Sequence, residues 1–373
     1  MNMRIAYVFR HAPAYVRSTK QINSLVAAGH QVTFIGWDLE PDKTRKHEMD
    51  PSVKVEILQM PGQFGKQNLS QWIKWWLFLS RHLVFGRFDA VQAVDEVAAL
   101  MVAPFKFWGF RFLILDVYDS VIKRKAGPVG AVVLNLIRFF ANVISDRIIE
   151  TSDELKETLG CFQKKAVVLF NSPLDPSEFI EGIFPNPSEP VRLAATGAIN
   201  SDSMALQCLV EALNLCPAGT VEVQCSGWLT DDYAKNVFAK HPAVKYQWIE
   251  SQVDYYKMIA SCDAVYNMRV DSGNSHYRAL VFPNKVFDAL AVGRPVIVAT
   301  ENWVSKWVRH NQAGLHCSFK DPAALSKILM GLPIQRIKLP ALATDSLQLF
   351  RSAYSWEIME KRLKEMYESL ARN

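Results

Sequence analysis

The chain lacks several features that would place it in a common class of protein. Its six cysteines form no Cys-x-x-Cys pair, and no Cys/His cluster has the spacing of a zinc site. No stretch of about twenty residues is free of charge, so we expect no membrane-spanning helix. The net charge of +5 is small for 373 residues and does not favour a nucleic-acid partner. Unpaired cysteines in apolar runs are typical of the reducing cytosol.

What the sequence does contain is a regular alternation of short apolar strands and amphipathic helices. Half of the residues are hydrophobic and 21% are charged, as in a globular protein. Such alternation predicts an α/β fold made of two Rossmann-like, doubly wound parallel-sheet domains, with ligands beyond the carboxyl ends of the strands. The expected strands are 5–9, 31–35, 54–58, 90–93, 111–116, 146–150 and 166–169, followed by 191–195, 221–226, 264–268 and 296–299.

A proline-rich segment separates the two series of strands. Five prolines fall between Asn171 and Pro190, with few apolar runs around them. Because proline interrupts both helices and sheets, we interpret this segment as a domain boundary. The expected divisions are a first domain at 1–171, a second at 172–350 and a closing helical segment at 351–373.

The segment 281–298, VFPNKVFDALAVGRPVIV, carries the strongest functional pattern. A polar loop with Asn284 and Lys285 opens a helix, Gly293 ends it, and a β-branched strand follows. Helix N-termini favour anions, Lys285 adds a charge there, and Asp288 can accept hydrogen bonds from hydroxyls such as those of a ribose. The pattern favours a nucleotide diphosphate, although helix-glycine-strand units without a ligand are equally common in α/β domains.

Several segments together resemble one family. The run 282–298 is similar to the PNK-x-x-E-x-x-x-x-G-x-P-V signature in the donor half of GT-B-fold glycosyltransferases of the family-4-like, group 1 type. The segments 168–173, 195–198, 263–265 and 354–356 resemble, in order, its hinge, first donor-domain turn, Ala-Asp-Val strand entry and closing helix. The resemblance implies two domains facing across a cleft, a closing helix that returns to the first domain, and a nucleotide sugar as the donor substrate.

The chain departs from this family pattern at three places. Leu280 stands where many retaining members have their first Glu, and Asp288 replaces the second. Residues 197–204 contain neither the Arg nor the Lys that members use against the diphosphate, and residues 10–13 replace a glycine pair. Two alternatives therefore stay open beside a transferase: a non-catalytic GT-B-like partner subunit that binds sugar or nucleotide, and a sugar-nucleotide epimerase of the same architecture.

The resemblance and the chemistry of the reaction together select the candidate donor-binding residues. A departing nucleotide diphosphate gains negative charge, which cations and N–H groups must stabilise. The candidates are Gly197, Asn200, Ser201, Arg269, Arg278, Asn284, Lys285 and Asp288. The two arginines would equally fit ordinary solvated surface charge. We expect no metal and no other cofactor, since no Asp-x-Asp motif lies in a fitting place.

On the acceptor side, the reaction requires a base that removes a hydroxyl proton. Asp119 follows the strand 111–116, and Tyr118 precedes it where the family has a histidine, so Asp119 is the first candidate. Asp95, at the end of another strand, is the second, whereas Asp116 is expected to hydrogen-bond backbone. His11 follows the first strand and is either an acceptor-side contact or a plain loop histidine.

The first half of the chain interleaves basic and aromatic residues. The segments 61–88 and 120–145 each contain four Lys or Arg residues and no acid, and an aromatic run at 105–112 lies between them. This combination suits an anionic membrane surface; the alternative is that these helices simply pack on the sheet. We therefore expect a cytoplasmic hexosyltransferase, peripheral at the inner face of the cell membrane, acting on a glycan or polyprenyl-linked glycan in polysaccharide biosynthesis.

Overall fold

The chain forms two compact units, each built on one parallel sheet. A computed structural model describes residues 2–12, 14–41, 48–62, 67–106, 108–118, 120, 127–187, 189–270, 282–336 and 339–372. Unit 1 comprises Met1–Asn171 and Glu360–Asn373, and unit 2 comprises Ser172–Met359. The chain therefore passes from one unit to the next between Asn171 and Ser172, and again within its last helix, α15 (Trp356–Ala371).

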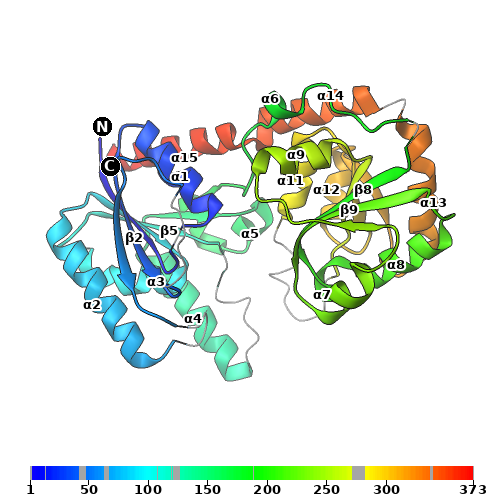
Figure 1. The fold of residues 1–373 in the computed structure, drawn as a ribbon. Helices are drawn as coiled ribbons and strands as arrows, with labels where there is room; N and C mark the ends of the chain where they lie inside the picture. Colours follow the sequence, from blue (N-terminus) through cyan, green and yellow to red (C-terminus); the bar gives the residue numbers. More distant parts are fainter. Residues whose placement is uncertain are drawn as a thin grey trace. The chain divides into compact units, whose positions relative to one another are not determined.

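The sheet of unit 1 has seven parallel strands in the order β3-β2-β1-β4-β5-β6-β7 (Figure 1). The order runs outward in both directions from β1, as in a doubly wound fold. The strands are β1 (Arg4–Phe9), β2 (Gln31–Asp38), β3 (Lys54–Gln59), β4 (Ala90–Val94), β5 (Phe112–Asp116), β6 (Arg147–Glu150) and β7 (Ala166–Val168).

Helices cover both faces of this first sheet. Ala6 and Val8 of β1 belong to the core under α2, α3 and α4, whereas Tyr7 contacts Gln21 of α1 on the other face. Such alternation follows from the two-residue period of a strand. The helices of unit 1 are α1 (Val16–Ala27), α2 (Leu69–Gly86), α3 (Glu96–Val102), α4 (Pro128–Ile144) and α5 (Asp153–Glu157), with 3₁₀ turns η1 (Ala103–Phe105) and η3 (Gly160–Lys165).

A polar network lies buried under α1 and α15. The Arg17 guanidinium pairs with the Asp116 carboxylate at 3.1 Å, and Gln92 Nε2 donates to the same carboxylate at 2.8 Å. The Tyr367 hydroxyl of α15 donates to Gln92 Oε1 at 2.8 Å. Burial raises the pKa of Asp116, against the lowering effect of Arg17. The end of α15 is thus hydrogen-bonded into the core of unit 1, and Asp116 binds side chains more than backbone.

The sheet of unit 2 has six parallel strands in the order β10-β9-β8-β11-β12-β13. They are β8 (Val191–Ile199), β9 (Val221–Leu229), β10 (Val244–Tyr246), β11 (Ala264–Asn267), β12 (Val296–Ala299) and β13 (Gly314–Cys317). Side chains of α8 (Leu206–Leu215) and α13 (Pro322–Gln335) form the core on one face with Leu193 and Val223. The second predicted doubly wound domain is confirmed (Figure 1).

The other helical segments of unit 2 are short. They are α6 (Ser177–Ile180), α7 (Ser201–Met204), α9 (Gln252–Ala260), α11 (Asn284–Ala291), α12 (Val304–His310) and α14 (Leu339–Leu349), with π-helical turns η4 (Ala234–Phe238) and η6 (Phe350–Tyr354). Ala205 has φ 45° and separates α7 from α8. The Ala205 carbonyl accepts from the buried Tyr266 hydroxyl at 3.0 Å, a tertiary contact that favours the break.

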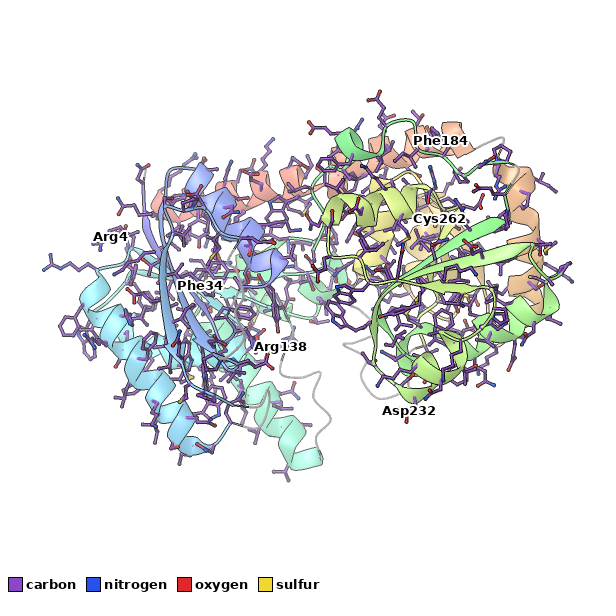
Figure 2. The ribbon with its side chains drawn as sticks, viewed as in Figure 1. Arg4, Phe34, Arg138, Phe184, Asp232 and Cys262 are labelled. Carbon is purple, nitrogen blue, oxygen red and sulfur yellow. The ribbon has the colours of Figure 1, made fainter. Side chains whose placement is uncertain are left out.

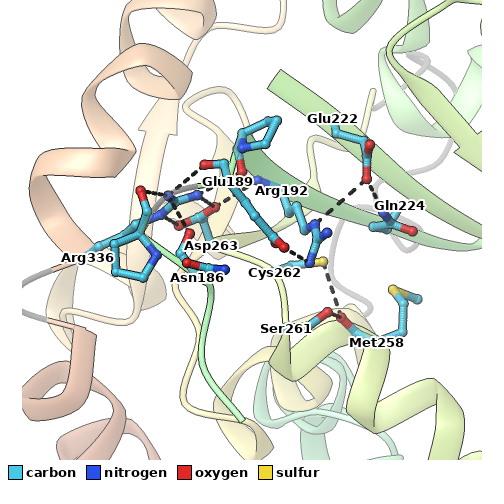
Figure 3. Close-up of polar contacts among 12 residues, drawn as sticks. Asn186, Glu189, Arg192, Glu222, Gln224, Met258, Ser261, Cys262, Asp263 and Arg336 are labelled. Carbon is cyan, nitrogen blue, oxygen red and sulfur yellow. Dashed lines mark hydrogen bonds and ion pairs between the residues drawn. The ribbon is translucent and has the colours of Figure 1, made fainter. Parts of the chain in front are cut away.

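The proline-rich segment is packed onto unit 2 by arginine side chains. The Arg336 guanidinium forms two bonds with the Asp263 carboxylate, at 2.6 and 2.8 Å, and donates to carbonyls of residues 186, 187, 189 and 190 (Figure 3). Arg294 likewise donates to the Ile183 carbonyl at 2.8 Å. Because each of these arginines donates to several groups at once, they hold a segment with little regular structure on unit 2.

α4 is the most exposed apolar helix of the described residues. Its exposed large side chains are Val129, Val132, Val133, Leu136, Phe139, Phe140 and Val143. Arg138, marked in Figure 2, instead contacts Thr158 Oγ1 at 2.7 Å and the buried Glu150 carboxylate at 3.8 Å. Throughout the described residues, no helix combines the length and the apolar character needed to cross a membrane.

Candidate functional site

Two glycines meet at the carboxyl edge of the second sheet. Gly197 of β8 has φ 92°, a conformation that favours glycine, and it pairs with Gly227 of β9. A Cβ atom at Gly227 would lie 2.0 Å from the Gly197 carbonyl oxygen, so the backbones approach too closely for any side chain there. The edge of the sheet is therefore bare backbone at the position where α/β folds bind ligands.

The first turn of α11 places Lys285 beside this bare edge. A Cβ atom at Gly197 would lie 3.0 Å from Lys285 Cε, so the lysine stem lies directly against the glycine. Lys285 Nζ is 3.1 Å from the Asp288 carboxylate, three residues further along the helix. The Lys285 side chain is 24% exposed, whereas Asp288 is buried. The ammonium group is thus held at the edge of the sheet, on a side chain that is partly exposed.

Two tyrosines of α9 complete the cluster. The Tyr255 hydroxyl accepts from Lys285 Nζ at 2.7 Å and donates to the Asp288 carboxylate at 2.9 Å. The Tyr256 hydroxyl donates to the other Asp288 oxygen at 3.2 Å, and Thr196 Oγ1 lies 3.1 Å from the Tyr255 hydroxyl. Sequence reasoning missed both tyrosines because nothing in the local pattern of α9 shows which of its side chains will contact α11.

The electrostatics of the cluster keep Lys285 charged. Burial alone would lower the pKa of Lys285, but the adjacent Tyr255 and the Asp288 carboxylate outweigh it and raise that pKa above its ordinary value. Burial and the Asp288 charge together raise the pKa of Tyr255 to about 12, against the lowering effect of Lys285. At neutral pH the lysine is a cation and the tyrosine a neutral hydroxyl, which suits binding of a phosphate oxyanion.

The other predicted donor residues that the structure describes lie in different parts of unit 2. Asn284 is exposed in the first turn of α11, next to Lys285. Ser201 lies beyond Asn200 at the start of α7, where its N–H and its hydroxyl both donate to the Asp231 carboxylate, at 2.7 and 2.5 Å. Arg269 follows β11, and its carbonyl accepts from Asn302 at 2.8 Å. Arg278 lies outside the described residues. Gly197, Lys285 and Asp288 are therefore brought together, while Ser201 already binds a carboxylate.

In unit 1, the predicted residues His11 and Asp95 follow β1 and β4, which are neighbouring strands of the first sheet. Asp95, directly after β4, has φ 72°, and its N–H donates to the Asp116 carbonyl at 2.9 Å. Its carboxylate lies 3.6 Å from the Arg10 guanidinium, which follows β1. A non-glycine residue with positive φ costs about 1–3 kcal/mol and is often found at functional sites. Glu96, which sequence reasoning did not select, is fully buried and accepts from the Ser120 hydroxyl.

His11 lies among aromatic rings at the same edge of unit 1. Its ring stacks on Tyr15 with centroids 5.4 Å apart and meets the edge of Phe9 at 5.0 Å. Burial and, to a smaller extent, the nearby Arg10 charge together lower the pKa of His11 to about 4. His11 is thus a neutral imidazole near pH 7, suited to a hydroxyl more than to a phosphate.

The first candidate base, Asp119, lies outside the described residues. Its neighbour Tyr118, which occupies the position of the family histidine, contacts the hydroxyls of Tyr7 and Ser18 at 2.9 Å each. The Arg17 guanidinium lies over its ring, 4.7 Å from the centroid. Tyr118 is therefore part of the buried network of unit 1, directly before Asp119.

Comparisons with known proteins match the chain at the level of structure. No protein-family model matches the sequence, and no curated protein matches it significantly. Sucrose-phosphate synthase from Thermosynechococcus elongatus is 14% identical, with a TM-score of 0.74 and 100% of both chains covered. Anabaena HepE in complex with UDP-glucose is 15% identical, with a TM-score of 0.68 over 99% of this chain and 100% of HepE.

A third solved structure extends the same likeness. WaaG, a glycosyltransferase involved in lipopolysaccharide biosynthesis, is 13% identical, with a TM-score of 0.65 over 97% of this chain and 99% of WaaG. The chain has the GT-B fold. Within this GT-B fold, the cluster of Lys285, Asp288 and Tyr255 belongs to the second sheet domain, and His11, Asp95 and Asp116 belong to the first.

Proposed function

We propose that the chain is a glycosyltransferase that moves a sugar from a nucleotide-sugar donor to a glycan acceptor. The observation that carries the proposal is the Lys285 ammonium, held by Asp288 and Tyr255 against the bare backbone at Gly197. A fixed cation at the carboxyl edge of a parallel sheet is suited to a diphosphate. HepE, which shares the fold, is described in complex with UDP-glucose.

In the proposed reaction, the bond between the anomeric carbon and the phosphate oxygen breaks, and a bond from that carbon to the acceptor oxygen forms. The nucleotide diphosphate keeps the electron pair, and Lys285 stabilises its new charge. The acceptor hydroxyl gives its proton to a carboxylate. We propose Asp119 for this role, with Asp95 second, because the Asp95 carboxylate already lies 3.6 Å from Arg10. Neither step requires a metal ion.

A donor screen tests the proposal. We expect the purified chain to release a nucleoside diphosphate, or CMP, from one of a panel of UDP-, GDP-, CMP- and dTDP-sugars, and faster with a lipid-linked glycan acceptor. Conversion of the donor to an isomer with the nucleotide retained would instead indicate an epimerase. Nucleotide binding without loss of sugar would indicate a non-catalytic partner subunit, and absence of binding to any member of the panel would overturn the proposal.

We further propose that the acceptor is a polyprenyl-linked glycan and that unit 1 contacts an anionic membrane surface. The support is the exposed apolar face of α4, on which Val129 is 80% and Phe140 52% exposed, together with the exposed Trp108, Phe85 and Lys74. Burying large apolar side chains favours membrane association, and basic residues favour anionic lipid. The aromatics of α2 are shared with the core, since Trp75 is fully buried and stacks on Trp37.

Liposome flotation tests the membrane contact. We expect the chain to float with vesicles of equal parts phosphatidylglycerol and phosphatidylcholine at low salt, and less with phosphatidylcholine alone. Leu136→Gln/Phe140→Gln should weaken this binding about tenfold or more, since each side chain contributes on burial. Leu215→Gln/Ile334→Gln, at exposed apolar positions of unit 2, is the matched control. Absence of flotation, or an equal loss in the control, would contradict the membrane contact and leave the transferase proposal intact.

A further inference from the structure

The Asp288 carboxylate is occupied by donors from the protein itself. Its Oδ2 atom accepts from the Tyr255 hydroxyl at 2.9 Å and from Lys285 Nζ at 3.1 Å, and its Oδ1 atom accepts from the Tyr256 hydroxyl at 3.2 Å. A carboxylate has about four acceptor positions, so three of them are used. Because Asp288 is only 7% exposed, the fourth position is also poorly placed to meet a ligand from solvent.

The hydrogen bonds of Tyr255 and Lys285 form one consistent set. The Tyr255 hydroxyl donates its proton to Asp288, which leaves its two lone pairs for Lys285 Nζ at 2.7 Å and Thr196 Oγ1 at 3.1 Å. The Lys285 ammonium has three N–H bonds, of which Tyr255 and Asp288 take two among the described residues. One N–H bond of a partly exposed cation is left over, and it is the group of this cluster that a ligand can reach.

We infer that Asp288, Tyr255 and Tyr256 are positioning residues that hold the Lys285 ammonium for the donor diphosphate, and that Asp288 does not bind the ribose. The inference rests on the proposed function and gives each group of the site a role. It departs from the sequence expectation that Asp288 accepts from ribose hydroxyls. An aspartate is one methylene shorter than the glutamate of the family signature, and here its carboxylate ends beneath Tyr255 and Lys285 instead of at the surface.

Paired titrations with ribose and deoxyribose nucleotides test the inference. We would measure binding of UDP, GDP, ADP and CDP, and of their 2′-deoxy and 3′-deoxy counterparts, to the full chain by calorimetry. The variants are Asp288→Asn, Tyr256→Phe, Lys285→Ala and Lys285→Ala/Asp288→Asn, with Lys257→Ala on the exposed side of α9 as the control. The double variant completes a cycle that measures the coupling of Asp288 to Lys285.

For the nucleotide that binds best, Asp288→Asn should weaken the ribose and both deoxyribose forms by the same factor, about 10- to 100-fold, since a charged hydrogen-bonding group is mispositioned. In the Lys285→Ala background the same change should have an effect of less than about threefold. Tyr256→Phe, which removes one hydroxyl and keeps the ring, should weaken all forms equally and less strongly. This milder variant decides the question if Asp288→Asn does not fold.

Two different results would overturn the inference. If Asp288→Asn or Tyr256→Phe weakens the ribose form and leaves a deoxyribose form unchanged, Asp288 binds the sugar hydroxyl, and the proposed function survives. If Asp288→Asn weakens nucleotide binding as strongly in the Lys285→Ala background as in the wild-type chain, Asp288 acts on the ligand directly. If no nucleotide binds the wild-type chain, the proposed function fails, and this inference fails with it.

Discussion

Replacing Lys285 with alanine is expected to lower kcat/KM for the nucleotide-sugar donor by about 10²–10³-fold, the usual effect of removing one fixed donor from a developing oxyanion. The ammonium is held at two points, 2.7 Å from the Tyr255 hydroxyl and 3.1 Å from the Asp288 carboxylate. It therefore meets the diphosphate without having to be ordered first. Initial rates of nucleotide release, measured over a range of donor concentrations, give the effect on kcat and on KM separately.

Two further variants make the Lys285 result specific. Lys257→Ala removes an exposed lysine from α9 in the same unit and should leave kcat/KM unchanged. Lys285→Arg keeps the charge but places a wider, planar group where the lysine stem lies directly against Gly197, so it should recover only part of the activity. If kcat/KM of the Lys285→Ala enzyme stays within about threefold of wild type, Lys285 does not stabilise the departing diphosphate.

Replacing Arg17 with methionine is expected to destabilise unit 1 by about 3–5 kcal/mol, because the change leaves the Asp116 carboxylate unpaired in the core. Asp116 is fully buried, and Arg17 Nη2 is 3.1 Å from it. Protection of the β5 amides against hydrogen exchange measures this free energy. The β12 amides of unit 2 are an internal reference and should keep their protection.

The loss should also depend on pH in a definite direction. Burial raises the pKa of Asp116, while Arg17 lowers it, so removing Arg17 raises that pKa further. At a pH between the two pKa values, a carboxyl with a raised pKa is protonated in the folded chain and ionised in the unfolded chain. Its free-energy cost to folding therefore grows as the pH rises. The Arg17→Met loss should be largest near pH 7 and smaller at acid pH.

A surface ion pair provides the control for the Arg17 prediction. Lys361 and Glu365 are four residues apart on α15, 4.0 Å from each other, with side chains 75% and 61% exposed. Lys361→Met should cost less than about 0.5 kcal/mol, because solvent screens such pairs. If Arg17→Met cost no more than this control, the Arg17–Asp116 pair would not hold the core of unit 1 together.

The fold could be predicted from the sequence to a large extent, because it follows from local signals. Eleven strands were expected, and each overlaps a strand of the structure, since buried parallel strands form continuous apolar runs. The strands β10 (Val244–Tyr246) and β13 (Gly314–Cys317) were missed. Both lie at the edges of the second sheet, and β13 contains His316, so neither forms a long apolar run.

The candidate site could be predicted only in part. Gly197, Lys285 and Asp288 lie in segments with a recognisable pattern, and the structure brings them together. Tyr255 and Tyr256 were missed, although they contact both oxygens of Asp288, because α9 and α11 are separated in sequence and meet only in the folded unit. Among the basic and aromatic residues of the first half, Arg138 lies 3.8 Å from the buried Glu150 carboxylate and Trp75 is fully buried, so some of them pack inside unit 1.

The sequence by itself determined the alternation of strands and helices, the proline-rich boundary and the placement of Lys285 at a helix start, because these depend on neighbours along the chain. Only the tertiary structure decided which groups the charged residues contact. Asp288 accepts hydrogen bonds from Tyr255 and Lys285, and Asp116 pairs with Arg17 across unit 1. Hydrogen-bond partners of buried carboxylates come from distant segments, and burial makes those partners obligatory.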